Sequence, residues 1–240
     1  MERINTDEIK NWIAPYLTVT GDTPEVNKIL KDTNILKYFQ ELTLPNIFEK
    51  YAIILHSFWI FNLTKNQIKR LNLEGKDILK SEPEFPENEY NSISWCNFYK
   101  FKNADFELKN AVENSVDWKF PFKQMNNELY PGEGIMDNKH LLEISGLGLK
   151  YFGDENLEVY YTFLATNNWD EDKMYRVKTS ELINLIENED TEKTPSLIYS
   201  IDKNWAINTD IDLQFSVIGG NENFINELIN NNPDEIYAII

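Results

Sequence analysis

The chain is short of the residues on which disulfide, zinc and histidine chemistry depend. Its 240 residues include one cysteine, Cys96, and two histidines, His56 and His140. A single cysteine excludes an internal disulfide and is typical of a reducing compartment. A zinc site built mainly from histidine and cysteine would have three such ligands at most, all widely separated in the sequence. We therefore expect no metal and no cofactor.

Positive charge and long apolar segments are also scarce. The chain has 23 Lys and Arg against 40 Asp and Glu, a net charge of −17. Nucleic-acid binding needs clustered basic residues that displace counterions, so we expect no nucleic-acid partner. The longest apolar stretch, residues 51–61, is about half of a membrane span. The N-terminus lacks the basic and apolar segments of a signal peptide, and we expect a cytoplasmic protein that does not enter the membrane.

The negative charge is unevenly distributed along the chain. Residues 181–240 contain twelve acidic residues and only two basic ones, Lys193 and Lys203, a net charge of −10. One interpretation is a device for solubility. The other is a docking surface, for which a charged partner would be basic.

Short apolar segments interspersed with helical ones indicate the fold class. The chain is 42% hydrophobic and 13% aromatic, as in globular proteins. Alternation and apolar runs predict a mainly antiparallel sheet with flanking helices, an α+β fold. We expect a helical N-terminal extension over residues 1–41 and an α+β domain over 42–240. The strands are expected at residues 52–56, 157–165, 174–177, 196–200, 205–209, 215–218 and 235–240, and the helices at residues 105–116, 138–151, 179–186 and 222–230.

Two local patterns predict further detail. Ile93–Cys96 predicts a short strand in which Cys96 is a buried, inert thiol. Gly219 and Gly220 predict a tight turn with positive φ, followed by Asn221 as the N-cap of a helix. An anion site at the start of that helix is the alternative, but the acidic flanks argue against it.

His56, Asp210 and Asp212 are the candidates for catalysis. Asp210 and Asp212 would project from the same face of an extended segment and could bind a cation, although aspartates so placed more commonly form turns. His56 ends an apolar strand and could act as a general base. The chain contains no Gly-x-Ser-x-Gly nucleophile motif. We therefore expect no catalytic site, and an enzyme acting on a small ligand through these three residues is the alternative hypothesis.

Trp169 is the leading candidate for a contact with a partner. It lies in the polar turn between two expected strands, where an exposed tryptophan would act as an anchor. Packing of Trp169 back onto the sheet is an equal alternative. The predicted partner-binding set consists of Trp169, Asp170, Asp202, Trp205, Asp210 and Asp212.

Several segments together carry a resemblance. Leu44–His56 matches the pattern LPxxFxxYAxxxH, and a segment with a tryptophan follows at Ile93–Trp95. Spread over residues 42–240, the segments resemble a family of uncharacterised bacterial proteins. Ser57 stands where that family often has proline, and Tyr199–Asp202 replaces an aromatic-Pro-Glu-Asp stretch. The closing part of the resemblance lies in Ser196–Tyr199, Trp205, Thr209–Asp212, Val217–Gly220 and the helical segment Phe224–Leu228.

The resemblance implies a bacterial, cytosolic α+β protein without an established catalytic site. Small acidic proteins of this kind are similar to immunity proteins of the SUKH type, which protect a cell from a toxin. Together with the net charge, this leads to the hypothesis of an inhibitor that occludes a basic toxin or effector domain, a nuclease being one such class. A scaffold module with no inhibitory role is a further alternative.

Overall fold

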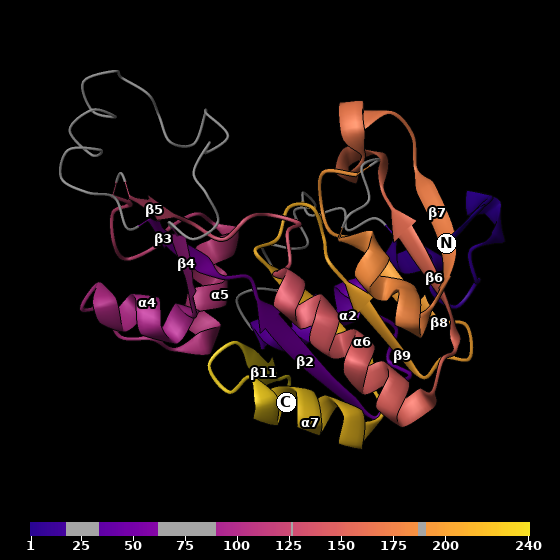
Figure 1. Cartoon of the computed structure of the whole chain (residues 1–240). Helices are drawn as coiled ribbons and strands as arrows, with labels where there is room; N and C mark the ends of the chain where they lie inside the picture. The colour runs from indigo at the N-terminus through magenta and orange to yellow at the C-terminus, as the bar shows by residue number, and fades with distance from the viewer. Residues whose placement is uncertain (18–33, 62–89, 126, 187–190) are drawn as a thin grey trace.

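The chain folds around one large antiparallel sheet and a smaller one, as the α+β prediction requires (Figure 1). The computed structural model describes residues 1–17, 34–61, 90–125, 127–186 and 191–240. Every neighbouring pair in the large sheet is antiparallel. Its order is β1 (Glu2–Ile4), β7 (Lys173–Lys178), β6 (Asn156–Tyr161), β8 (Leu197–Ser200), β9 (Trp205–Asn208), β10 (Phe215–Gly220), β2 (Lys50–Leu55) and β11 (Ile236–Ala238).

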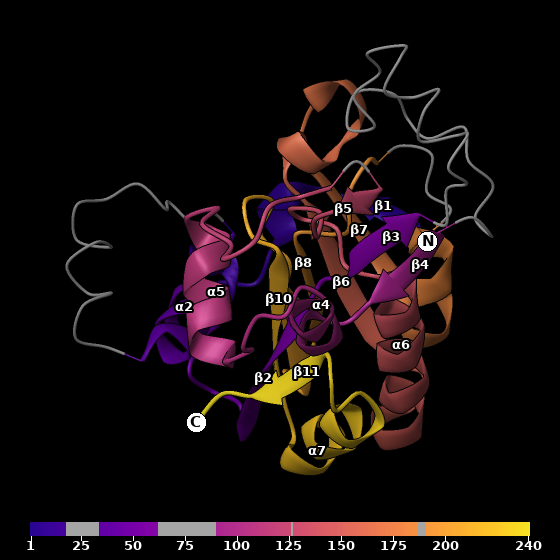
Figure 2. The same cartoon turned by 90° about the vertical axis from the view of Figure 1, so that its left-hand side faces the viewer.

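Helices cover both faces of the large sheet (Figure 2). One face carries α6 (Asn138–Phe152), α7 (Glu222–Asn231) and the 3₁₀ helix η6 (Thr179–Leu185), and the other carries α2 (Ile35–Thr43) and α5 (Leu108–Val116). Because successive strand residues point to opposite faces, a strand covered on both sides needs an unbroken apolar sequence. In the part of the chain that the structure describes, no helix is both long and apolar enough to cross a bilayer.

Strand β2 illustrates this double burial. Ile53 and Leu55 pack into the core on the α2 side, and Ala52 and Ile54 pack into the core on the α6 side. All four side chains are at most 1% exposed. The apolar run that predicts this strand is therefore a direct consequence of its central position in the sheet.

A second, three-stranded sheet extends the core on the α2 side. It has the order β4 (Tyr90–Ile93), β3 (Phe58–Phe61) and β5 (Glu128–Leu129), next to α4 (Trp95–Phe101). The strand predicted over 93–96 is wrong beyond its first residue. Ser94 caps α4 by accepting a hydrogen bond from the N–H of Asn97, and a residue of this type at an N-cap favours a helix start. Cys96 thus lies on a helix and is partly buried.

The N-terminal residues that the structure describes belong to the main body. β1 pairs with β7, so residues 2–4 form an edge strand and not a helix. The short 3₁₀ helices η1 (Thr6–Glu8) and η2 (Ala14–Tyr16) follow, and Ile13 between them is fully buried. The boundary expected between residues 41 and 42 falls inside α2. Residues 18–33 of the predicted extension lie outside the described residues.

The diglycine turn predicted at Gly219 and Gly220 is wrong, although Asn221 does cap the following helix. Both glycines lie inside β10, and neither has a positive φ. The physical reason is close packing. A Cβ atom on Gly219 would stand 2.5 Å from Cδ2 of Phe48 and 2.7 Å from Cε1 of Tyr51. Glycine is needed here for space and not for backbone freedom.

We expect Gly219→Ala to destabilise the protein by about 1–3 kcal/mol, because the added methyl group overpacks the contact with Phe48 and Tyr51. Gly146→Ala is the matched control. Gly146 is exposed on α6, and a Cβ atom there has nothing within 4 Å, so this change is expected to stabilise by about 0.5–1 kcal/mol. Urea denaturation of the two variants measures both changes in the free energy of unfolding. A change of the same sign in both variants would contradict the close packing inferred for Gly219.

Candidate functional site

The antiparallel register brings several loops to one end of the large sheet. Tyr160 is opposite Leu197, Leu197 is opposite Asn208, and Asn208 is opposite Val217. The β6–β7 and β9–β10 connections therefore leave the sheet at the same end. We call this region, residues 132–136, 162–173, 191–196 and 209–214, the loop end.

Hydrogen bonds between loops make the loop end one unit. The N–H of Gly134 donates to the carbonyl of Leu213 at 3.0 Å. Nζ of Lys193 donates to the carbonyls of Glu133 at 2.9 Å and Ile211 at 3.2 Å. Gly134 has φ +66°, and a Cβ atom there would stand 2.9 Å from Cα of Ile211, so only glycine fits. Lys193 thus links the loop of Glu133 to the β9–β10 connection.

The β6–β7 connection projects from the loop end and carries two exposed aromatic side chains. It contains η4 (Phe163–Ala165) and η5 (Asn167–Trp169) and is the orange segment at the top of Figures 1 and 2. Trp169 is 66% exposed and Phe163 is 43% exposed. Of the two alternatives for Trp169, the structure thus has the exposed one.

The backbone at Trp169 is held in an unfavourable conformation. Asn168 and Trp169 have φ values of +61° and +52°, in the left-handed region that bulky residues rarely adopt. Such a residue costs on the order of 1–3 kcal/mol, which the surrounding structure must offset. Here the N–H of Phe163 donates to Oδ1 of Asp172 at 2.7 Å, and the N–H of Trp169 donates to Thr166. An exposed aromatic residue that is anchored in this way is preorganised for contact.

A groove lies at the base of this loop. It encloses about 170 Å³ between the loop and the β9–β10 connection. Oδ1 of Asp210 accepts a hydrogen bond from the N–H of Asp212 at 2.9 Å, the turn that the sequence predicts for these aspartates. Its lining consists of Leu17, Thr162, Phe163, Leu164, Ser196, Asn208, Asp210, Ile211 and Asp212.

Asp210 is the electrostatically perturbed group of the groove. Burial and, to a smaller extent, the neighbouring carboxylates of Asp212 and Glu133 together raise its pKa to about 6. The N–H of Asp212 and the charge of Lys193 oppose this shift. An ionised Asp210 therefore costs the folded state free energy at neutral pH, and a bound cation would relieve that cost.

The carboxylates of the loop end are largely unneutralised. The loop end contains seven acidic residues and two lysines, Lys173 and Lys193. Within the described ranges, neither Asp170, Glu192, Asp210 nor Asp212 takes part in an ion pair. No three histidine, cysteine or acidic side chains of those ranges gather closely enough to hold a metal. The region therefore presents negative charge to solvent without a metal-ligand cluster.

Two of the six predicted contact residues do not belong to this surface. Trp205 is fully buried, and its Nε1 donates to Oε1 of Glu155 at 2.9 Å. Its place in a strand covered on both faces explains why the prediction fails for it. Asp202 is exposed, but it lies in the β8–β9 turn at the opposite end of the sheet. Trp169, Asp170, Asp210 and Asp212 remain together at the loop end.

The acidic residues of the last quarter do not form one face. Asp210 and Asp212 lie at the loop end, Asp202 lies at the other end, and Glu227 on α7 pairs with Lys150. Helix α7 also separates Glu222 from the turn that holds Asp234 and Glu235. The uneven charge along the sequence is therefore spread over several surfaces in space, and it does not by itself define a docking surface.

His56 does not meet Asp210 and Asp212 in the groove. Its side chain is 1% exposed, with Nδ1 2.9 Å from the carbonyl of Gly132 and Nε2 3.0 Å from Oγ of Ser216. Burial lowers the pKa of His56 to about 3, although the carbonyl of Gly132 opposes the shift. The imidazole is therefore neutral, and its two hydrogen bonds hold it in the core. It is absent from the groove lining, so the geometry gives no support to the alternative of an enzyme.

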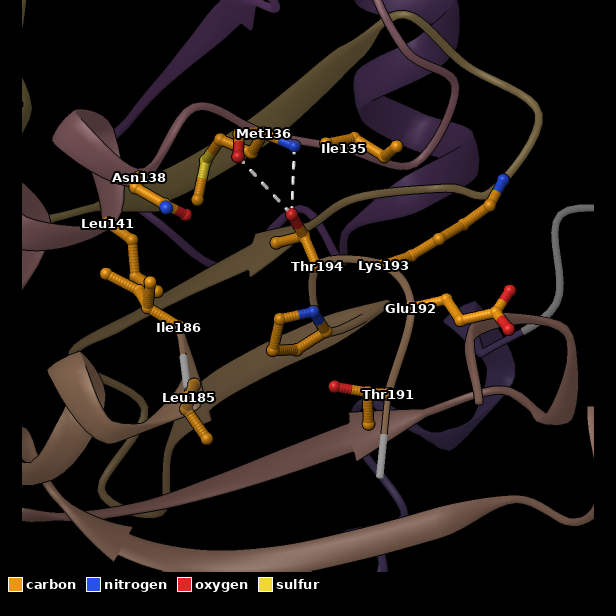
Figure 3. Close-up of a pocket in the computed structure, with 11 residues that line it drawn as sticks. Ile135, Met136, Asn138, Leu141, Leu185, Ile186, Thr191, Glu192, Lys193 and Thr194 are labelled. Carbon is orange, nitrogen blue, oxygen red and sulfur yellow. Dashed lines mark hydrogen bonds between the residues drawn. The ribbon is translucent and has the colours of Figure 1, made fainter. Parts of the chain in front are cut away.

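A second cavity lies beside the loop end, between the start of α6, η6 and residues 191–195 (Figure 3). It encloses about 130 Å³, and its lining mixes apolar side chains such as Leu141 and Leu185 with polar ones such as Asn138 and Thr194. Oγ1 of Thr194 accepts a hydrogen bond from the N–H of Met136 at 2.9 Å. Figure 3 shows the charged ends of Glu192 and Lys193 directed away from the interior. Because its two ionisable lining residues direct their charged ends outward, this cavity is a weaker candidate for a binding site than the groove.

The sequence predicts only Asp210 and Asp212 of the nine residues that line the groove, and Phe163 and Asn208 are among the seven that it misses. Phe163 was placed inside a strand predicted over 157–165, but β6 ends at Tyr161 and η4 turns Phe163 outward. Nothing in the local pattern marks that end. The sequence does mark Asn208, because burying an amide in an otherwise apolar strand costs free energy unless a hydrogen-bond partner is present.

We expect stability to decline as the pH falls below 6.5, because His56 stays neutral in the fold and becomes protonated in the unfolded chain. The depressed pKa means that this loss continues down to about pH 3. At pH 5 it amounts to about 2 kcal/mol. Urea denaturation between pH 7 and pH 5 measures it. In His56→Gln this part of the pH dependence should disappear, and an unchanged slope would refute the assignment.

We expect Asp210→Asn to stabilise the protein at pH 7 by roughly 1–3 kcal/mol, since it removes a charge that burial disfavours while Oδ1 can still accept the N–H of Asp212. The raised pKa sets the pH window: the gain is full above pH 6 and vanishes near pH 4, where the wild-type carboxyl is protonated. Thermal unfolding at pH 7 and pH 4 compares the variants. Destabilisation at pH 7 would contradict this account.

The chain matches no protein-family model, no curated protein and no solved structure. The similarity of Leu44–His56 and the C-terminal segments to a bacterial immunity-type family therefore stays a prediction. What the protein does has to be argued from the loop end itself.

Proposed function

We propose that the protein is an acidic binding protein of the immunity type, which occludes a basic toxin or effector domain through its loop end. The observation that carries the proposal is the exposed, preorganised side chain of Trp169 at the same end as Asp170, Asp210 and Asp212. These three carboxylates have no ion-pair partner in the described ranges, whereas Glu171 of the same loop pairs with Arg3. Inside a bacterial cell, such a surface would cover the active face of its target.

The aromatic residues supply affinity in this proposal. Trp169 and Phe163 both lie on the projecting loop, and large aromatic side chains dominate the binding energy of protein interfaces. The anchored backbone of the loop means that little conformational freedom is lost on binding. The left-handed backbone at Trp169 already holds the side chain in its exposed position, so binding does not require the loop to rearrange.

The carboxylates supply speed and selectivity. Asp170, Asp210 and Asp212 lie at the same end as Trp169, so a basic partner is attracted toward the aromatic contact. Electrostatic attraction of this kind raises association rates strongly at low ionic strength and disfavours acidic partners. A nuclease domain, which needs a basic surface to bind phosphates, has the matching chemistry.

The test is co-expression in bacteria of this chain with basic toxin domains encoded next to its gene. We expect it to rescue growth from one of them and to form a complex whose association rate falls as salt is added. The proposal is overturned if no such domain is bound and none is neutralised.

We expect Trp169→Ala to weaken the complex by at least about 30-fold in Kd, the effect of a hot-spot tryptophan, with unfolding unchanged. Phe101→Ala is the matched control, because Phe101 is 56% exposed on α4, outside the loop end. Asp202→Asn controls for charge at the other end of the sheet. Isothermal titration calorimetry compares the three variants, and equal losses from Trp169→Ala and Phe101→Ala would place the contact elsewhere.

A further inference from the structure

We propose that the groove lined by Asn208, Asp210 and Asp212 is a receptor for one lysine side chain of a basic protein partner. This inference rests on the proposed function and deepens it, because it names the group that enters the loop end. Three features support it: the hydrogen-bond acceptors of the groove, its apolar wall and its size.

The acceptors match a primary ammonium group. Asp210 and Asp212 each present a carboxylate, and Oδ1 of Asn208 is buried without a hydrogen-bond donor. Asn208 is 4% exposed, and its Nδ2 already donates to the carbonyl of Tyr16 at 3.1 Å, next to Leu17 of the groove wall. A buried acceptor without a partner costs free energy until a ligand supplies a donor. An ammonium group carries three donors and no acceptor, which suits this set.

The remaining wall matches the stem of lysine. Leu17, Phe163 and Leu164 line the groove with apolar atoms. Lysine side chains bury their methylene groups along such surfaces while the charged end makes the polar contacts. The volume of about 170 Å³ admits one such side chain. Phe163 of the loop that carries Trp169 lines this groove, so the groove and the exposed tryptophan belong to one surface.

Other cations fit this groove less well. An arginine needs a planar, bidentate acceptor for its five donors, and Oδ1 of Asp210 is already engaged by the N–H of Asp212. Divalent ions need six or more oxygen ligands, or several retained waters, which an apolar wall does not supply. The raised pKa of Asp210 agrees with a carboxyl group whose cationic partner comes from outside.

The test uses the full chain and a small probe, Nα-acetyl-lysine-N-methylamide, followed by ¹H–¹⁵N NMR. We expect roughly millimolar binding with shifts at the Asn208 side-chain amide and the backbone of 210–212. The norleucine analogue, which lacks the charge, should cause no such shifts, and the arginine analogue should bind at least tenfold more weakly. Asp210→Asn and Asp212→Asn should each weaken the lysine probe at least tenfold, and Asp202→Asn should leave it unchanged.

Equal binding of the norleucine or arginine analogue would overturn the inference, as would tighter binding of Ca²⁺ alone at the same residues. Because Asp212 is exposed, its variant tests the groove even if Asp210→Asn perturbs the fold. The two proposals fail separately. If the probe binds but no toxin partner is found, only the proposed function fails. If a toxin partner is found but the lysine probe causes no shifts in the groove, only this inference fails.

Discussion

The register of the antiparallel strands β6 to β10 is the constraint on which the whole site depends. Pairing Tyr160 with Leu197, Leu197 with Asn208 and Asn208 with Val217 leaves no freedom in where the connecting loops emerge. A slip of one residue would send every side chain to the opposite face, where it would meet the core that belongs to the other face. Because both faces of the sheet are covered by helices, packing on both sides fixes the register. The fixed register in turn determines where the loops of the loop end lie.

The loop end maintains features that cost stability. A tryptophan lies in the left-handed region, a carboxyl group is partly desolvated, and an asparagine oxygen is buried without a donor. Each opposes folding, and a cationic donor from a partner would offset the costs at the carboxyl group and at the asparagine oxygen. Glu155 at the other end of the sheet shows the contrast, since it accepts hydrogen bonds from Ser200, Asn204 and Trp205. The loop end is therefore the place where a strained backbone, a partly desolvated carboxyl group and an unpaired amide oxygen occur close together.

Sequence reasoning recovered the fold class, the buried strands and most helices, because apolar runs and helical spacing report burial directly. It failed where a contact between distant segments decides the outcome. Gly219 is a glycine because Phe48 and Tyr51 lie against it, and no neighbouring residue encodes that contact. Charge counted along the chain likewise misplaced Asp202, since the chain reverses between β8 and β9, and Trp205 is buried in β9. Trp169, Asp170, Asp210 and Asp212 come together only through the register.

The central claim is that a basic polypeptide is received at the loop end and nowhere else on the described surface. Backbone chemical-shift mapping with a tetralysine peptide at low ionic strength tests it most directly. The account predicts shifts confined to the loop end and Asn208, which disappear as salt is raised. Shifts of equal size at the β8–β9 turn or along α7 would contradict it, because they would mean that the peptide follows net charge and not this surface.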